Sequence, residues 1–261
     1  MADRPNESHP ESIGENPFGP PAQPPLRIAH LMLWTAGTAL VLGMYRATYD
    51  SIDYELPNSI RTIFNVNRIL SSIIHGAAIA SVVIFVHRRL TKGPPFPVQP
   101  GHWLLFIQGL LVLITLPGWS VFVLLQSQGT FDGGTRWITP DILFVGLQVL
   151  SHGTTIGTYG WALRRLQAER RWRLLFWLEL GFGICNLLAS LAGFVPWLPG
   201  LRVLGFQWMG ATVPAVWLLV AALLDWRRRA RRDWLHWTGV VEQLSGAALA
   251  LSTNLCVMFV Q

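Results

Sequence analysis

Two histidines lie in matching ten-residue stretches of otherwise apolar sequence. His75 lies in "SIIHGAAIAS" (72–81) and His152 in "VLSHGTTIGT" (149–158), and an Arg-Arg-Leu triplet follows each stretch. An imidazole can bind haem iron, or it can take up and release a proton near neutral pH. Duplication of a helical hairpin would also leave such a pair without any chemistry. The helices that carry the two rings must therefore be considered next.

The two rings are expected at the same depth. His75 precedes Arg88 by thirteen residues, and His152 precedes Arg164 by twelve. At 1.5 Å of rise per residue, each ring lies roughly 18–20 Å from the basic end of its helix, close to the middle of a hydrocarbon core about 30 Å thick. The sequence thus predicts two midplane histidines on parallel helices.

The composition is typical of a membrane protein. Of the 261 residues, 51% are hydrophobic and only 13% are charged, which is too little charge to cover a soluble domain. The apolar residues form blocks of about 20 residues, the length that spans a bilayer. Seven such segments are predicted: 26–46, 63–86, 103–126, 138–163, 173–195, 203–225 and 234–260. We therefore expect an all-α polytopic membrane helix bundle, with residues 26–261 as one seven-helix transmembrane domain.

The connectors alternate in charge and predict an orientation. The basic ones are 87–92, 164–173 and 225–233, and the acidic or weakly charged ones are 49–55, 128–136 and 196–202. The positive-inside rule places the N-terminus in the cytoplasm and the C-terminus outside, in a cytoplasmic (inner) membrane of bacterial style. Arginines at segment ends indicate contact with the lipid bilayer and no nucleic-acid partner. Residues 1–25 are Pro-rich and poor in aliphatic residues, which predicts a disordered tail.

Polar residues recur at helical spacing within the apolar segments. Such stripes must face inward, because donors and ionisable groups are costly against lipid. They comprise Asn65, Arg68, Ser72 and His75; Asp141, Gln148, His152, Thr155 and Tyr159; Glu179, Gly183, Asn186 and Ser190; and Glu242, Ser245, Ser252 and Cys256. On a neighbouring face of the fourth segment, Gly153 and Gly157 form a GxxxG pattern, which predicts close approach of another helix.

Transport or proton relay is the best functional interpretation of these stripes. In this hypothesis His75 and His152 are accompanied along a small-molecule, ion or proton path by Arg68, Asp141, Gln148, Glu179, Asn186 and Glu242. Intramembrane carboxyl groups and histidines mark such paths. Pro117 and Pro214 are expected to interrupt their helices and expose backbone carbonyls.

Two other hypotheses stay open. The pair His75 and His152 has the ligand type and matched depth of a bis-histidine b-type haem site for electron transfer. Alternatively, both histidines only pack between helices in a structural membrane protein. No catalytic motif such as Walker, HExxH or GxSxG is present, so no enzyme class is indicated. A metal site is not expected because a carboxylate is missing at that depth.

Overall fold

The computed structural model describes residues 28–49, 58–91, 96–127, 140–192 and 204–260, and every regular element in these ranges is an α-helix. The helices are α1 (Ile28–Tyr49), α2 (Asn58–Leu90), α3 (Pro100–Ser127), α4 (Pro140–Arg165), α5 (Arg170–Ala192), α6 (Leu204–Arg227) and α7 (Trp234–Val260). Each corresponds to one predicted apolar segment, so the all-helical prediction is confirmed. The predicted disordered tail, 1–25, lies outside the described residues.

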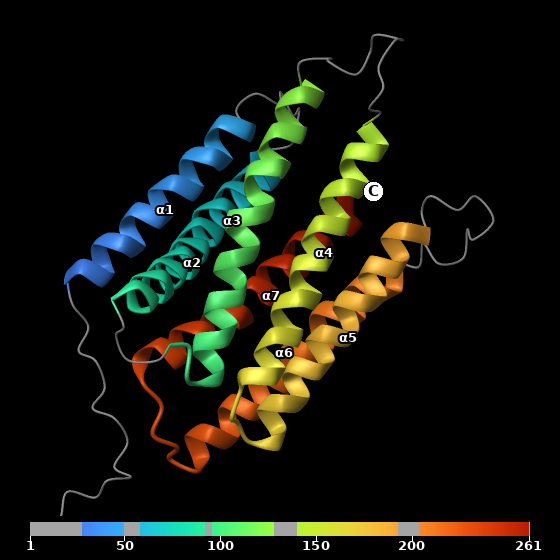
Figure 1. Cartoon of the computed structure of the whole chain (residues 1–261). Coiled ribbons are helices and arrows are strands. Elements are labelled where there is room, and N and C mark those ends of the chain that lie inside the picture. Colours follow the sequence, from blue (N-terminus) through green and yellow to red (C-terminus); the bar gives the residue numbers. More distant parts are fainter. Residues whose placement is uncertain (1–27, 50–57, 92–95, 128–139, 193–203, 261) are drawn as a thin grey trace, which may run out of the picture.

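Successive helices run in opposite directions, and α7 joins the two halves of the bundle (Figure 1). In the first half α2 packs against both α1 and α3, and in the second half α5 packs against both α4 and α6. The contacts of α3 with α4, and of α7 with α2, α3 and α6, hold the halves together. This arrangement makes α7 the helix that meets both halves.

A buried hydrophobic core lies at the end of the bundle where the basic connectors emerge. Buried aromatic residues of three helices meet there: Trp103 and Phe106 of α3, Tyr159 of α4, and Trp172 and Phe176 of α5. The rings of Tyr159 and Phe176 pack edge to face, with centroids 5.5 Å apart. Because α3, α5 and α7 begin at this end, their first turns are fixed by the core.

In the described part of the chain, four helices are long and apolar enough to cross a membrane: Ile28–Ala47 in α1, Phe64–Leu90 in α2, Pro100–Leu125 in α3 and Arg170–Ala192 in α5. Large apolar side chains also point outward, including Met32, Leu188 and Val216. Water would make such a surface aggregate, whereas lipid solvates it. The helical bundle is therefore compatible with an integral membrane protein; the seven spans and their orientation stay predictions.

Two local predictions were wrong. Gly153 and Gly157 lie on an exposed face of α4, where a Cβ would meet nothing within 4 Å. The close approaches instead involve Gly76 of α2 against α1, and Gly101 and Gly239 where α3 meets α7. Pro117 and Pro214 lie inside α3 and α6 without ending either helix. A GxxxG pattern can face a neighbouring helix or the outside of the bundle. Only the tertiary arrangement decides which of the two faces Gly153 and Gly157 occupy.

Candidate functional site

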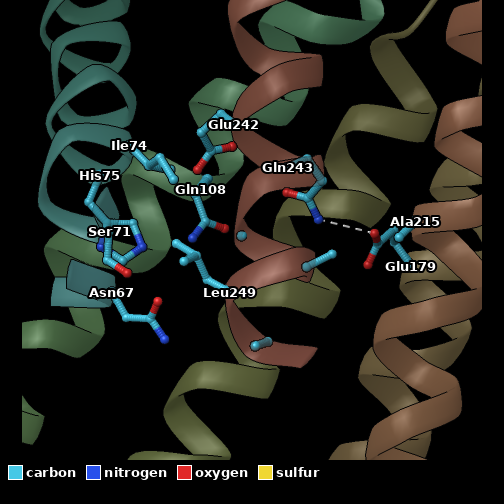
Figure 2. A pocket seen from close by; sticks show the side chains of 13 residues that line it. Asn67, Ser71, Ile74, His75, Gln108, Glu179, Ala215, Glu242, Gln243 and Leu249 are labelled. Carbon is cyan, nitrogen blue, oxygen red and sulfur yellow. Dashed lines mark hydrogen bonds between the residues drawn. The ribbon is translucent and has the colours of Figure 1, made fainter. Parts of the chain in front are cut away.

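A cavity of about 430 Å³ lies among α2, α3, α5, α6 and α7. Its lining combines polar groups with small side chains. The lining residues are Asn67, Ser71, Ile74, His75, Gln108, Glu179, Ala215, Glu242, Gln243, Gly246, Ala247, Leu249 and Ala250. Figure 2 shows the α2 group on one side, the Gln243–Glu179 pair on the other, and Gln108 and Glu242 between them in that view. Every titratable group of the lining thus comes from a different helix.

The α2 side of the cavity is one helical face. Asn67, Ser71 and His75 follow each other at a spacing of four, so their side chains lie one above the other. Close packing of Gly76 against Thr38 of α1 leaves no room for a Cβ. That contact fixes the rotation of α2 and turns the His75 face toward the cavity.

Among the described residues, His75 has a hydrogen-bond partner on α1. Its Nδ1 lies 3.4 Å from the hydroxyl of Tyr45 on α1, and the two ring centroids are 6.5 Å apart. This contact leaves the other ring nitrogen, Nε2, for a further partner. The imidazole can therefore be part of a hydrogen-bonded chain that begins at Tyr45 and continues into the cavity.

Glu242 is the most unusual group of the lining. The residue is 4% exposed, and its buried Oε2 has no hydrogen-bond partner in the described part of the chain. A buried polar atom without a partner costs free energy, and native proteins contain few of them. Such an atom indicates a bound water, a ligand or a functional role. Glu242 is thus the strongest candidate for a functional residue.

Glu179 of α5 reaches the same cavity from the other half of the bundle. Its Oε1 accepts a hydrogen bond of 3.2 Å from the side-chain amide of Gln243. Gln243 follows Glu242 directly on α7. One turn of α7 therefore carries both the carboxyl group of Glu242 and the amide that binds the carboxyl group of Glu179. The cavity therefore links the two halves of the bundle through two acidic residues.

A capped junction between α3 and α7 sets the position of Glu242. Asp233 precedes α7, and its Oδ1 accepts hydrogen bonds from the backbone N–H of His236 (2.9 Å) and from Nε2 of His102 (2.7 Å). In return, the backbone N–H of Gly101 donates to Nδ1 of His236 at 3.0 Å. Asp233 thus caps the first turn of α7, and His236 of α7 supplies an acceptor for an unpaired N–H group in the first turn of α3. The first turns of α3 and α7 are thereby locked together.

The charge of Asp233 is stabilised by this junction. Burial disfavours the carboxylate, but the hydrogen bond and charge of His102 and the backbone N–H of His236 favour it. The balance lowers the pKa of Asp233 below its ordinary value. Asp233 is therefore an ionised helix cap at neutral pH, where its charge also complements the positive end of the α7 dipole.

A second buried carboxylate, Asp225, ties α5 to the end of α6. It is fully buried, pairs with Arg171, and accepts hydrogen bonds from Nε of Arg232 (2.8 Å) and from the indole of Trp172 (3.2 Å). His236 Nε2 lies 3.9 Å from the same carboxylate. A buried charge is tolerated only with such partners. The network extends the junction across four helices.

The structure brings together three of the predicted site residues: His75, Glu179 and Glu242 line one cavity. The lining does not include Arg68, Asp141, Gln148, His152 or Asn186. The Nη1 of Arg68 donates to Asn65 on its own helix at 3.3 Å. The side chain of Asp141 lies outside the described residues.

The stripe of α4 that carries His152 runs along a different interface. Thr155 and Ile156 face Gly183 of α5, and Tyr159 packs on Phe176 of the same helix. The main contacts of α4 are with α3 and α5, whereas those of α2 are with α1, α3 and α7. The described geometry therefore gives the two-histidine haem hypothesis no support, and it stays a prediction.

Sequence reasoning missed four polar residues of the cavity: Asn67, Ser71, Gln108 and Gln243. A signal was available for Ser71 and Asn67, because they precede His75 by four and eight residues and so lie on the same helical face. Gln108 is an amide in the middle of a strongly apolar run, which is itself unusual. His102 and His236 were assigned no role, although their side chains hold the junction.

The fold and the cavity define a class, a helical bundle that is compatible with a multi-pass membrane protein and has a cavity with polar groups in its lining. The chain matches no protein-family model, no curated protein and no solved structure. Function is therefore inferred from the cavity itself.

Proposed function

We propose that this membrane protein moves protons, alone or together with a small polar solute, through the cavity lined by His75, Glu179 and Glu242. The observation that carries the proposal is the buried, unpartnered Oε2 of Glu242 at that cavity. A carboxyl group inside an apolar bundle costs free energy, and intramembrane acidic residues mark ion and proton paths.

The lining supplies the parts that a proton relay needs. Two carboxyl groups and one imidazole exchange protons, whereas the amides of Gln108 and Gln243 only donate and accept hydrogen bonds. A water molecule takes about 30 Å³ of liquid volume, so a cavity of about 430 Å³ has room for several waters. Those waters would connect titratable groups that do not touch.

The experiment is proton flux into liposomes that contain the purified protein and a trapped pH-sensitive dye. An imposed pH gradient, with valinomycin and potassium to clamp the voltage, should give flux above that of protein-free liposomes. Glu242→Gln keeps the shape of the side chain but cannot ionise, so we expect flux at the protein-free level. Glu179→Gln and His75→Gln should lower flux as well.

The matched control is His87→Gln, which removes an exposed imidazole from the same helix as His75. It should leave flux unchanged. His152→Gln separates the cavity from the path predicted by the sequence, because a loss equal to that of His75→Gln would place α4 on the path. Equal flux of the wild-type protein and Glu242→Gln would overturn the proposal.

A further inference from the structure

An open groove of about 780 Å³ lies where α6 ends and the chain turns toward α7, away from the cavity described above. Its walls are of two kinds. Leu219, Leu223 and Trp226 form an apolar side along α6, and the arginines of the turn form the other. The arginines are Arg227, Arg229, Arg231 and Arg232, and the remaining lining residues are Ala222, Ala230 and Trp237.

Among the described residues, three of the four arginines have no carboxylate in an ion pair with them. Arg232 is engaged, because it binds Asp225 and lies 3.3 Å from Glu169. Arg227, Arg229 and Arg231 are exposed, and none of them forms an ion pair within the described ranges of the chain. The groove therefore presents an unbalanced positive charge.

The backbone of the turn gives an independent indication. α6 ends in a Schellman motif, in which Ala230 N–H donates to the carbonyl of Asp225 (2.9 Å) and Arg229 N–H to that of Trp226 (3.0 Å). Arg229 occupies the left-handed position of this motif with φ of 51°. Glycine is the residue that adopts this conformation without strain. An arginine there keeps a strained backbone, which indicates that its side chain has a role beyond the turn.

We propose that this groove binds an anionic glycerophospholipid. The phosphate lies among Arg227, Arg229 and Arg231, and an acyl chain lies along Leu219 and Leu223. Arginine binds phosphate through several N–H groups at once. A free phosphate would use the cationic rim only, whereas the apolar wall continues from that rim along an exposed face of α6.

The exposed indole of Trp226 supports a lipid as the occupant. This residue is 74% exposed, and it lies at the end of the apolar side, directly before Arg227 in the sequence. Tryptophan is enriched at the level of the lipid headgroups, where its ring meets the hydrocarbon and its N–H meets water. Cationic, interfacial and apolar residues thus follow one another in the order that a phospholipid requires.

The test is native mass spectrometry of the full chain in detergent with added dioleoyl-phosphatidylglycerol or dioleoyl-phosphatidylcholine. We expect the wild-type protein to retain the anionic lipid preferentially. Arg229→Gly should weaken that retention about fivefold, the effect expected for one basic residue near an anionic lipid. Because glycine relieves the backbone strain, the melting temperature of this variant should not fall, and the loss of lipid is then not a loss of fold.

The matched control is Arg165→Gln, an exposed arginine at the end of α4 that does not line the groove. Its lipid retention should stay within about twofold of wild type. Loss equal to that of Arg229→Gly would show attraction by net charge only and would overturn the site. Release of the lipid by millimolar inorganic phosphate or glycerol phosphate would make it a free-phosphate site and would also overturn the proposal. Weaker retention of dihexanoyl- than of dioleoyl-phosphatidylglycerol would support the acyl-chain wall.

Discussion

His102 and Asp233 form a buried pair in which Nε2 of the imidazole lies 2.7 Å from Oδ1 of the carboxylate. The two residues stand at the starts of α3 and α7, far apart in the sequence. The same carboxylate oxygen caps α7 through the backbone N–H of His236. One side chain thus orders the first turn of the helix that carries Glu242.

Replacement of Asp233 should therefore destabilise the bundle. Asp233→Ala removes the cap and leaves His102 buried without its partner, and we expect a loss of about 2–4 kcal/mol in the free energy of unfolding. Asp233→Asn keeps an oxygen acceptor and should lose about half as much. Unfolding in mixed detergent, followed by circular dichroism, measures both. Equal losses for the two variants would show that a neutral oxygen recovers nothing and that the charge of Asp233 carries the effect, whereas no loss for Asp233→Asn would show that the charge contributes nothing.

The stability of the junction should depend on pH with a defined sign. The pKa of Asp233 is lowered in the folded protein, so the unfolded chain binds a proton first as pH falls. The stabilisation is then fully present above about pH 4, the ordinary range of an aspartate, and is lost as pH falls further through the folded pKa. His102 and His236 face the same carboxylate and are present in both proteins. The difference in melting temperature between wild type and Asp233→Asn isolates Asp233, and it should shrink in acid; a constant difference would contradict the assignment.

Close packing of α3 on α7 should make Gly239 intolerant of a side chain. A Cβ at this position would overlap the carbonyl oxygen of Gly101, and backbone cannot move aside as a flexible side chain can. We expect Gly239→Ala to cost at least about 2 kcal/mol in the free energy of unfolding.

Gly153→Ala is the control for this substitution. A Cβ there meets open space, so alanine should stabilise α4 by about 0.5–1 kcal/mol or leave it unchanged. A large loss at Gly153 and none at Gly239 would show that the helix contacts are assigned to the wrong glycines.

Replacement of Glu242 by an apolar residue should raise the stability of the protein and abolish its proton flux. Leucine has no polar atoms, so Glu242→Leu removes the cost of an unpartnered buried oxygen. We expect the free energy of unfolding to rise by about 1–2 kcal/mol, while proton flux is lost. The melting temperature and the liposome assay on one preparation test both parts. A lower melting temperature would show that Glu242 stabilises the fold and would favour a structural role.

The sequence by itself determined the helices and the environment they suit. Apolar runs near 20 residues specify helices because an apolar solvent leaves backbone groups no partner except their own helix. The three basic connectors, 87–92, 164–173 and 225–233, indicated one common end, and the described contacts of His102, Arg171 and Asp233 lie together there. Both properties, the length of the apolar runs and the charge of the connectors, are local features of the sequence and do not depend on contacts between helices.

Only the tertiary structure decided which polar faces meet. His75 and His152 have equivalent local sequences, yet His75 lies on a cavity with Glu242 and the face of His152 runs along α5. Asn67 and Ser71 line that cavity, whereas the sequence had placed Asn65 and Ser72 on the same face as His75. The two faces differ by a rotation of α2 about its own axis that the residue pattern is too coarse to specify. That rotation is set by the packing of Gly76 on α1 and by the capped junction of α3 and α7, and both are contacts between residues distant in the chain. Helical periodicity tells which residues share a face, whereas the direction of the face depends on the neighbouring helices.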